Sequence, residues 1–245
     1  MGEQMREGWC RMAKRRKVSN LLALTLLAQL QQRPMYPYEM ASMLREHGKD
    51  QAIKINWGSL YTVVQNLEKN GFIEAIEVVR EGRQPERTTY RITEAGRAEV
   101  KDWLRELIGE PEREYSRFEA GLGDAANLPP DEVVALLRKR LDVLDKANEE
   151  TGNGLTMLVE SQQVPRLFLI ENEYYLAMRK AEAEWVRGLL AELADGTFPG
   201  LDFWQVLHQV GGLDGSGNFP ELPEETEVPP AIVAAFDRRG GADQQ

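Results

Sequence analysis

The sequence predicts a mainly α-helical protein with two domains, of which the first carries one small β-hairpin. Three observations predict this class. Apolar residues recur at helical spacing in three short segments between residues 19 and 70. Two segments rich in β-branched and aromatic residues follow, with a loop containing Gly and Pro between them. From about residue 131, two long segments again have helical periodicity.

The first helix is expected from about Ser19 to Gln32, with Ser19 as its N-cap. Leucines on most of its sides predict a buried core helix. A turn with two prolines follows. The second helix is expected from about Tyr38 to Glu46 and should end at His47-Gly48, because Gly suits the left-handed position after a helix.

The third helix, from Asn56 to Glu68, has two contrasting faces and should end at Asn70-Gly71. Its apolar residues recur at i, i+3, i+4 and i+7 and predict the buried face: Leu60, Val63, Val64 and Leu67. The opposite face carries short polar side chains and one charge: Ser59, Thr62, Gln65, Asn66 and Lys69. Hydroxyl and amide groups of this kind bond phosphate oxygens or base edges without an ionic desolvation cost.

Two strands are expected next, over Ile73–Arg80 and Arg87–Ile92, with the polar loop 81–86 at the hairpin tip. Thr93 should cap a further helix that runs to about Ile108. The order helix, helix, helix, hairpin, helix is that of a winged helix-turn-helix. In that fold the third helix enters the major groove and the hairpin lies along the adjacent backbone. We assign residues 1–17 to a flexible basic arm and 18–110 to this DNA-binding domain.

Residues 111–210 are expected to form a helical dimerisation domain, and 211–245 a disordered tail rich in Gly, Pro and Glu. After a connector over 112–130, a long helix should start near Asp131 and break at Gly152-Asn153-Gly154. Its leucines repeat at heptad spacing and predict a seam for a partner subunit. The predicted seam residues are Leu137, Leu141 and Leu144.

After Pro165 a second long helix should run to about Ala194 with two apolar stripes, and Asp202–Val210 should form a short helix. One stripe contains Leu167, Ile170, Tyr174, Ala177 and Ala181, and the other Leu169, Leu176, Ala183 and Leu190. One stripe could pack on the chain's own helices and the other on a second subunit. The dimerisation residues assigned to this helix are Leu169, Leu176 and Leu190.

Charge is divided unequally along the 245 residues. The first 100 residues hold 16 Lys and Arg against 12 Asp and Glu, a net charge of +4, so the rest must hold 14 against 28, a net charge of −14. This division is expected if only the first part meets a polyanion. No run reaches the roughly 18 apolar residues of a membrane span. With the single Cys10, these features favour a cytoplasmic protein.

The candidate DNA contacts lie on the second helix, the third helix and the hairpin: Tyr38, Ser59, Tyr61, Thr62, Gln65, Asn66, Lys69, Arg83 and Arg87. Tyr61 could instead pack in the core, Tyr38 could be an ordinary surface tyrosine, and the hairpin arginines could be merely solvated. The basic cluster from Arg11 to Lys17 could grip DNA or could be a solvated tail.

Enzyme chemistry is not indicated, since the two histidines, His47 and His208, stand in no catalytic or metal-binding pattern. We therefore expect no catalytic residue, no metal and no cofactor. An apolar effector pocket between the domains could be lined by aromatic residues, although packing in a core or dimer explains them more simply: Trp103, Tyr174, Tyr175, Trp185 and Trp204. A protein-interaction module without DNA binding remains the alternative function.

Several motifs resemble the PadR family of bacterial transcription regulators. They are Gly58-Ser59-Leu60-Tyr61, Asn70-Gly71-Phe72-Ile73 and Tyr90-Arg91-Ile92-Thr93-Glu94-Ala95-Gly96, within a match from about Ser19 to Ile108. The long second half is similar to the branch with an extended C-terminal helical domain. The resemblance implies a homodimer that binds a pseudo-palindromic operator, more often as a repressor, and responds to a small molecule or stress.

Overall fold

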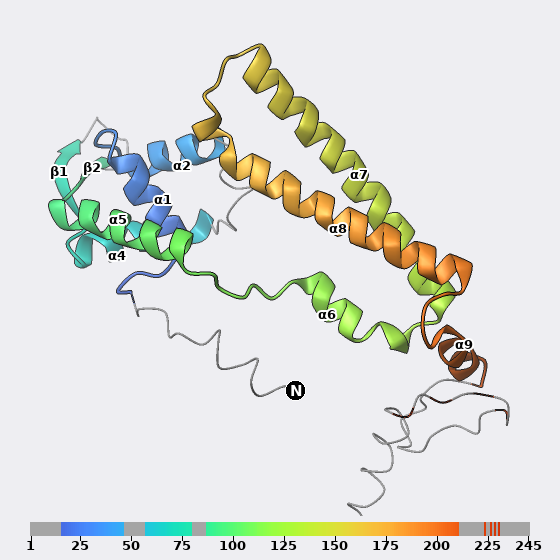
Figure 1. Cartoon of the computed structure of the whole chain (residues 1–245). Helices are drawn as coiled ribbons and strands as arrows, with labels where there is room; N and C mark the ends of the chain where they lie inside the picture. Colours follow the sequence, from blue (N-terminus) through green and yellow to red (C-terminus); the bar gives the residue numbers. More distant parts are fainter. Residues whose placement is uncertain are drawn as a thin grey trace, which may run out of the picture. The chain divides into compact units, whose positions relative to one another are not determined.

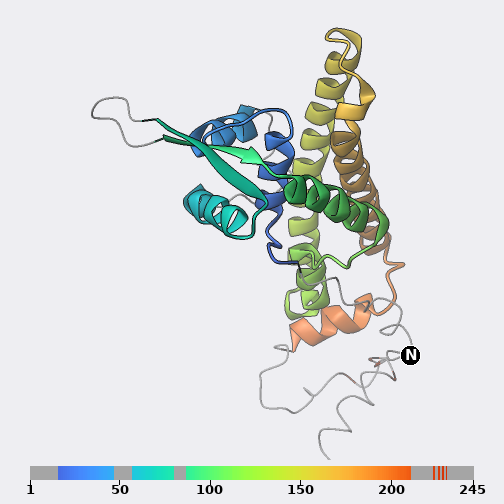
Figure 2. The ribbon, with the colours of Figure 1, turned by 90° about the vertical axis from the view of Figure 1, so that its left-hand side faces the viewer.

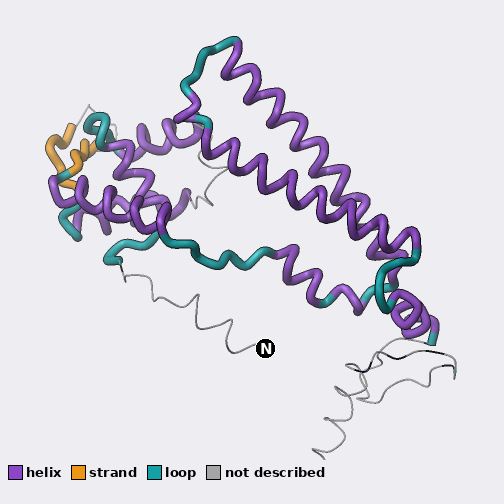
Figure 3. Tube along the Cα trace, in the orientation of Figure 1, coloured by secondary structure: helices purple, strands orange, loops and turns teal. Residues whose placement is uncertain are grey.

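The computed structural model describes residues 16–46, 57–79 and 87–210, and positions 223, 226, 228 and 230. The chain divides into two compact units, Met1–Glu114 and Tyr115–Gln245. Most described residues of both units are helical, and the strands belong to the first unit alone (Figure 3). Four predicted features lie outside the described residues: the arm before Arg16, the helix end at His47-Gly48, the hairpin tip and nearly all of the tail.

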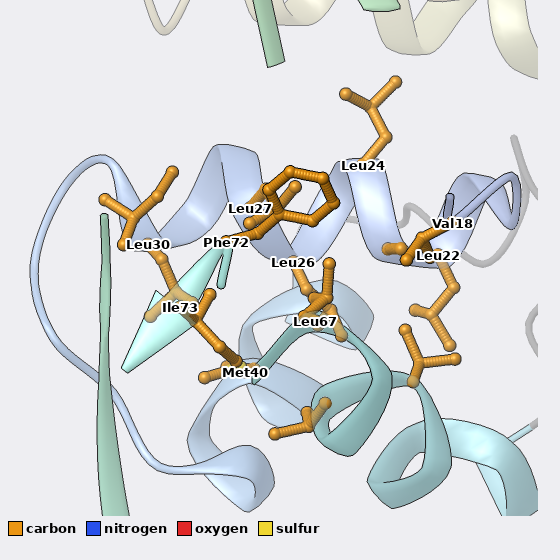
Figure 4. Packing of buried hydrophobic residues seen from close by; sticks show 14 of the residues in the cluster. Val18, Leu22, Leu24, Leu26, Leu27, Leu30, Met40, Leu67, Phe72 and Ile73 are labelled. Carbon is orange, nitrogen blue, oxygen red and sulfur yellow. The ribbon is translucent and has the colours of Figure 1, made fainter. Parts of the chain in front are cut away.

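Helix α1 (Leu21–Leu30) is the central helix of the first unit and is buried on most sides, as predicted. Its N-cap is Asn20 and not the predicted Ser19, because the Asn20 Oδ1 accepts a hydrogen bond of 2.9 Å from the Leu22 N–H. Leu26 of α1 meets Met40 of α2 (Pro37–Glu46) and Leu67 of α4 (Leu60–Lys69) in the core (Figure 4). These three helices therefore share one hydrophobic core.

The 3-10 helix η1 (Trp57–Ser59) precedes α4, so the predicted third helix begins as a tighter turn. Its α-helical part ends at Lys69, and Gly71 adopts a φ of +75°. This left-handed conformation strains residues with a Cβ, which confirms the predicted stop at Asn70-Gly71.

Strands β1 (Ile73–Val79) and β2 (Arg87–Ile92) form the antiparallel hairpin, which projects from the helices as a wing (Figure 2). The register runs from Ile73 opposite Ile92 to Val79 opposite Arg87, with an irregularity between Ala75 and Glu77. Met35 adds a bridge on the other edge of β2. Its N–H donates to the Tyr90 C=O at 3.1 Å, and its C=O accepts from the Tyr90 N–H at 2.9 Å. The turn before α2 is thereby attached to the wing.

Helix α5 (Glu94–Gly109) closes the first unit and begins at Thr93 as predicted. The Thr93 hydroxyl accepts from the Gly96 N–H at 3.1 Å and donates to the Gly71 C=O at 2.7 Å. One side chain therefore caps α5 and holds the turn that ends α4. The side chains of Val100 and Trp103 pack α5 against the hydrophobic core of the first unit.

The second unit consists of α6 (Arg117–Gly123), η2 (Ala125–Asn127), α7 (Pro130–Glu160), η3 (Arg166–Phe168), α8 (Ile170–Asp195) and α9 (Leu201–Gln209). Figure 1 shows α7 and α8 side by side, with α9 near one end of the pair. The short helix α9 confirms the prediction for 202–210. Helix α6 was not predicted; Ser116 starts it, because its Oγ accepts from two backbone N–H groups at 3.2 and 3.3 Å.

The predicted break of α7 at Gly152-Asn153-Gly154 is wrong, because the helix continues to Glu160. Glycine in a helix costs about 1 kcal/mol relative to alanine, which tertiary contacts can offset. Arg179 of α8 supplies such contacts next to these glycines. Its Nη2 donates to the Ala147 C=O at 3.0 Å and to the Thr151 hydroxyl at 2.5 Å.

The predicted leucine seam packs α7 against α8 of the same chain. Leu137 joins Val186 and Leu193 in the core of the second unit, and Leu141 and Leu190 pack against that core. The remaining predicted dimerisation residues are buried or half-buried within the chain: Leu144, Leu169 and Leu176. The structure therefore gives the predicted leucines an intrachain role, because the heptad spacing of α7 is satisfied by α8.

Candidate nucleic-acid interface

Helix α4 presents a polar outer face on a buried apolar base. Leu60, Val63, Val64 and Leu67 are at most 5% exposed. The opposite side chains are all exposed, namely Tyr61, Thr62, Gln65, Asn66 and Lys69, and Ser59 is half-buried just before the helix. The core thus fixes the helix, while its hydroxyl and amide groups remain accessible to a ligand.

Tyr61 does not pack in the core, because its side chain is 62% exposed on the outer face of α4. Tyr38, in the first turn of α2, is 66% exposed. An exposed phenol carries a hydroxyl that can donate to a phosphate oxygen. Both tyrosines are thus exposed, and their contact with DNA stays a prediction.

The wing is fastened to α4 and is thereby positioned beside the polar face. The Tyr90 hydroxyl of β2 donates to the Glu68 carboxylate of α4 at 3.5 Å. Burial raises the pKa of Tyr90, and the Glu68 carboxylate raises it further. The phenol therefore stays protonated, and remains a donor, at neutral pH. Across the hairpin, the Arg91 guanidinium bonds the Glu74 carboxylate at 2.7 and 3.0 Å.

Gly96 permits close approach between α5 and the end of α4. A Cβ at this position would lie 2.1 Å from the Phe72 carbonyl oxygen and 2.8 Å from Ile92 Cγ1. The same Phe72 carbonyl accepts from the Thr93 N–H at 3.0 Å. The motif Thr93-Glu94-Ala95-Gly96 therefore has a structural role, since it holds together the start of the wing, the turn after α4 and α5.

Two candidate DNA contacts, Arg83 and Arg87, belong to the wing. Arg83 lies outside the described residues, and Arg87 is described only as the first residue of β2. Their predicted contact with phosphates or the minor groove stays a prediction.

Arg16 departs from its predicted place in the basic arm. Its side chain is only 3% exposed, and its guanidinium lies within 3.4 Å of the carboxylates of Glu99, Asp102 and Glu106 on α5. It also lies 5.3 Å from the ring centroid of Trp103. The acidic residues at i, i+3 and i+7 of α5 were the sequence signal for this partner. In this structure Arg16 is part of the folded domain and is not available to DNA.

Part of the first unit matches the model of a known protein family. The model of the transcriptional regulator PadR-like family matches residues 26–102, which include α2, α4, the wing and most of α5. Residues 26–102 are thus similar to the DNA-binding regulators of the PadR-like family. The match lies within the first unit, so this PadR-like domain contains the polar face of α4.

Solved PadR structures share the fold. Bacillus subtilis PadR in complex with operator DNA is 20% identical, with a TM-score of 0.59 over 71% of this chain and 99% of that chain. The same protein with p-coumaric acid is 18% identical, with a TM-score of 0.59 and the same coverage. The protein smu.1604c from Streptococcus mutans is 23% identical, with a TM-score of 0.51 over 69% and 98%. No curated protein matches the chain.

The PadR-like family generally consists of non-enzymatic DNA-binding proteins. Within the described residues, no group of three or more His, Cys, Asp or Glu side chains could hold a metal ion. No helix in the same part of the chain is both long and apolar enough to cross a membrane.

Proposed function

We propose that this PadR-like protein is a homodimeric, sequence-specific DNA-binding repressor. The observation that carries the proposal is the exposed polar face of α4. The buried apolar face of the same helix fixes it in the core, and the wing follows it in the fold. Side chains of this kind read base edges in the major groove, and the wing lies along the neighbouring backbone. The complex of Bacillus subtilis PadR with operator DNA supports the same use of the fold.

The proposed operator is pseudo-palindromic, because a two-fold dimer presents two copies of α4 to half-sites about one helical turn apart. Release by a small molecule or a stress signal is part of the proposal. The complex of Bacillus subtilis PadR with p-coumaric acid supports a small-molecule signal. As a DNA-binding regulator, the protein would act in the cytoplasm.

The proposed dimer surface is the exposed stripe of α8. Ile170, Tyr174, Met178 and Trp185 are each more than half exposed, and their spacing puts them on one helical face. The opposite face of α8 packs in the core through Ala183, Val186 and Leu193. An apolar face of four large side chains is unusual on the surface of a monomer and favours contact with a second copy.

The test begins with operator DNA selected from a random pool with the full-length protein. Ser59→Ala combined with Gln65→Ala should lower the affinity for that operator about tenfold to a hundredfold, because the variant loses two polar contacts of α4. Lys101→Ala on the exposed side of α5 is the control and should leave affinity nearly unchanged. Unchanged affinity of the double variant in a gel-shift titration would remove α4 from the interface.

A further inference from the structure

Tyr90 lies at the point where the wing bends. The two strands are in register up to Ala75 opposite Tyr90, and beyond this pair Ile76 is the extra residue of a β-bulge. We call the strand residues on the far side of the bulge, 77–79 and 87–89, the outer wing. Because a bulge bends its strand and increases the local twist, the direction of the outer wing depends on how Tyr90 is held.

The main chain of Tyr90 is held by the turn before α2. Its N–H donates to the Met35 C=O at 2.9 Å, and its C=O accepts from the Met35 N–H at 3.1 Å. Met35 is fully buried in the core of the first unit, and α2 begins two residues later at Pro37. Tyr38, a candidate DNA contact, lies in the first turn of that helix. These two hydrogen bonds therefore join the wing to the start of α2.

The side chain of Tyr90 is held by α4. Its ring is half-buried and packs against the core of the first unit, and its hydroxyl donates to the Glu68 carboxylate at 3.5 Å. Burial raises the pKa of Tyr90 and Glu68 raises it further, which outweighs the opposite effect of a hydrogen bond with Thr88. Glu68 lies in the last turn of α4, next to Lys69 of the polar face. The hydroxyl therefore connects the wing to the helix that carries the candidate base contacts.

The base of the wing is joined to the end of α4 by other groups. Three hydrogen bonds make this connection: Phe72 N–H to Leu67 C=O at 3.0 Å, Thr93 N–H to Phe72 C=O at 3.0 Å, and Thr93 hydroxyl to Gly71 C=O at 2.7 Å. None of these three bonds uses an atom of Tyr90. Removal of the Tyr90 hydroxyl should therefore leave the fold and the base of the wing intact, and should change only how the outer wing is held.

We propose that Tyr90 is a positioning residue for DNA binding, which sets the direction of the outer wing relative to α4. It joins the three elements that face DNA in the proposed complex, namely the start of α2, the last turn of α4 and the wing. Tyr90 acts through Met35 and Glu68, and not by a contact of its own with DNA. This inference rests on the proposed DNA-binding function.

The consequence concerns contacts with phosphates and not the reading of bases. In a winged helix the wing lies along the backbone beside the groove that the recognition helix enters. Phosphate contacts add affinity on any sequence, and each contributes about 0.9 to the slope of log K against log salt concentration. A wing that is not held at its bend makes fewer of these contacts, whereas the polar face of α4 keeps its contacts with bases.

The first experiment compares Tyr90→Phe, which keeps the ring and removes the hydroxyl, with the wild-type full-length protein. Affinity should fall about threefold to tenfold, by a similar factor for the selected operator and for unrelated DNA, since phosphate contacts carry no sequence information. The salt slope should become shallower by about one for each wing in the complex. The urea midpoint should stay near that of the wild type. Tyr175→Phe makes the same change on α8 and should alter none of these quantities.

A matched pair of variants tests whether Tyr90 acts through Glu68. Glu68→Gln and Glu68→Ala both remove the negative charge, but glutamine keeps an oxygen that can accept from the phenol. Tyr90→Phe should therefore lower affinity in the Glu68→Gln background and have no further effect in the Glu68→Ala background. With Tyr90 present, Glu68→Ala should have a shallower salt slope than Glu68→Gln. This last comparison also provides the test if Tyr90→Phe does not fold.

A titration without DNA follows the hydrogen bond itself. In NMR spectra of ring-labelled tyrosine, the signal of Tyr90 is the one that is absent from Tyr90→Phe. The pKa of Tyr90 should lie above that of an ordinary tyrosine, and Glu68→Ala should lower it, because the carboxylate is one cause of the rise.

Four results would overturn the proposal. They are unchanged affinity and salt slope in folded Tyr90→Phe, an equal loss from Tyr90→Phe in both Glu68 backgrounds, equal salt slopes in Glu68→Gln and Glu68→Ala, and a pKa of Tyr90 that Glu68→Ala does not move. Wild-type protein that binds no DNA at all would instead contradict the proposed function, and the titration would still report whether Tyr90 bonds Glu68.

Discussion

At the scale of single residues, Gly96 shows how the family motif at the end of the wing maintains the fold. Its Cα lies against the Phe72 carbonyl, which also accepts the hydrogen bond of the Thr93 N–H. The absence of a side chain, and not backbone flexibility, is what this position requires, because a Cβ would meet the carbonyl oxygen at 2.1 Å.

Gly96→Ala should lower the free energy of unfolding by about 2–4 kcal/mol, because the backbone of Phe72 or of α5 must move. Gly109→Ala in the same helix is the control. No atom lies within 4 Å of its Cβ, so it should be neutral or stabilising by up to about 1 kcal/mol. Urea unfolding measures both variants, and equal stabilities would show that the close approach is not required.

Arg16 is the second residue whose role depends on its tertiary partners. Three α5 carboxylates surround a guanidinium that is 3% exposed, although two of those carboxylates are about a fifth exposed and one nearly half. Removing the guanidinium leaves these carboxylates close together without a counter-charge.

Arg16→Ala should therefore lower the free energy of unfolding by about 1–3 kcal/mol. The adjacent Lys17→Ala should change it by less than about 0.5 kcal/mol, because Lys17 is exposed. Thermal unfolding of the full-length protein checks the pair. A larger loss in Lys17→Ala would contradict the role of Arg16 as the anchor.

At the scale of elements, the two predicted apolar stripes of α8 differ in burial. Leu169 and Ala183 are buried within the chain, whereas Ile170 and Tyr174 are exposed. The stripe predicted to contact a partner subunit is thus buried within the chain, and the exposed stripe is the one that we propose as the dimer surface.

Tyr174→Glu combined with Met178→Glu should convert the proposed dimer to monomers, because two charges would be buried in an apolar interface. The helix content and unfolding transition should be retained, since both positions are exposed in the chain itself. Leu137→Glu is the contrasting variant and should unfold the second unit, because Leu137 is 3% exposed. Sedimentation and circular dichroism distinguish the outcomes; a stable dimer in the double variant would exclude this stripe.

At the scale of the whole molecule, charge is divided between a mildly basic first part and a strongly acidic second part. The protein as a whole has a net charge of −10, which opposes its approach to DNA. Its affinity for DNA must therefore come from cationic side chains that lie close to the phosphates. On α4 the cation of the exposed face is Lys69, in the last turn.

Operator affinity should fall steeply with salt, with a slope of about −0.9 per phosphate contact in a plot of log K against log salt concentration. Lys69→Ala should make the slope shallower by about one for each α4 in the complex. Lys101→Ala is the control and should not change it, since Lys101 is an exposed residue of α5 and does not belong to the polar face of α4. A flat salt response of the wild-type protein would favour the protein-interaction alternative.

Local sequence patterns determined most elements of this protein. Amphipathic spacing, the Thr93 cap, Gly71 and the β-branched residues of the wing each act through neighbours within a few positions, so their structure follows from short-range physics. The outer face of α4 was predictable for the same reason, because the buried positions of a short helix imply the exposed ones.

Only the tertiary structure decided which residues and helices far apart in the sequence contact one another. The continuation of α7 through its glycines depends on Arg179 of α8, the burial of Arg16 depends on α5, and Phe118 of the unpredicted helix α6 packs on Trp185 of α8. These contacts join residues 28 to 90 positions apart. Periodicity indicates which face of a helix is apolar, but the partner of that face is chosen by competition among all apolar surfaces of the folded chain.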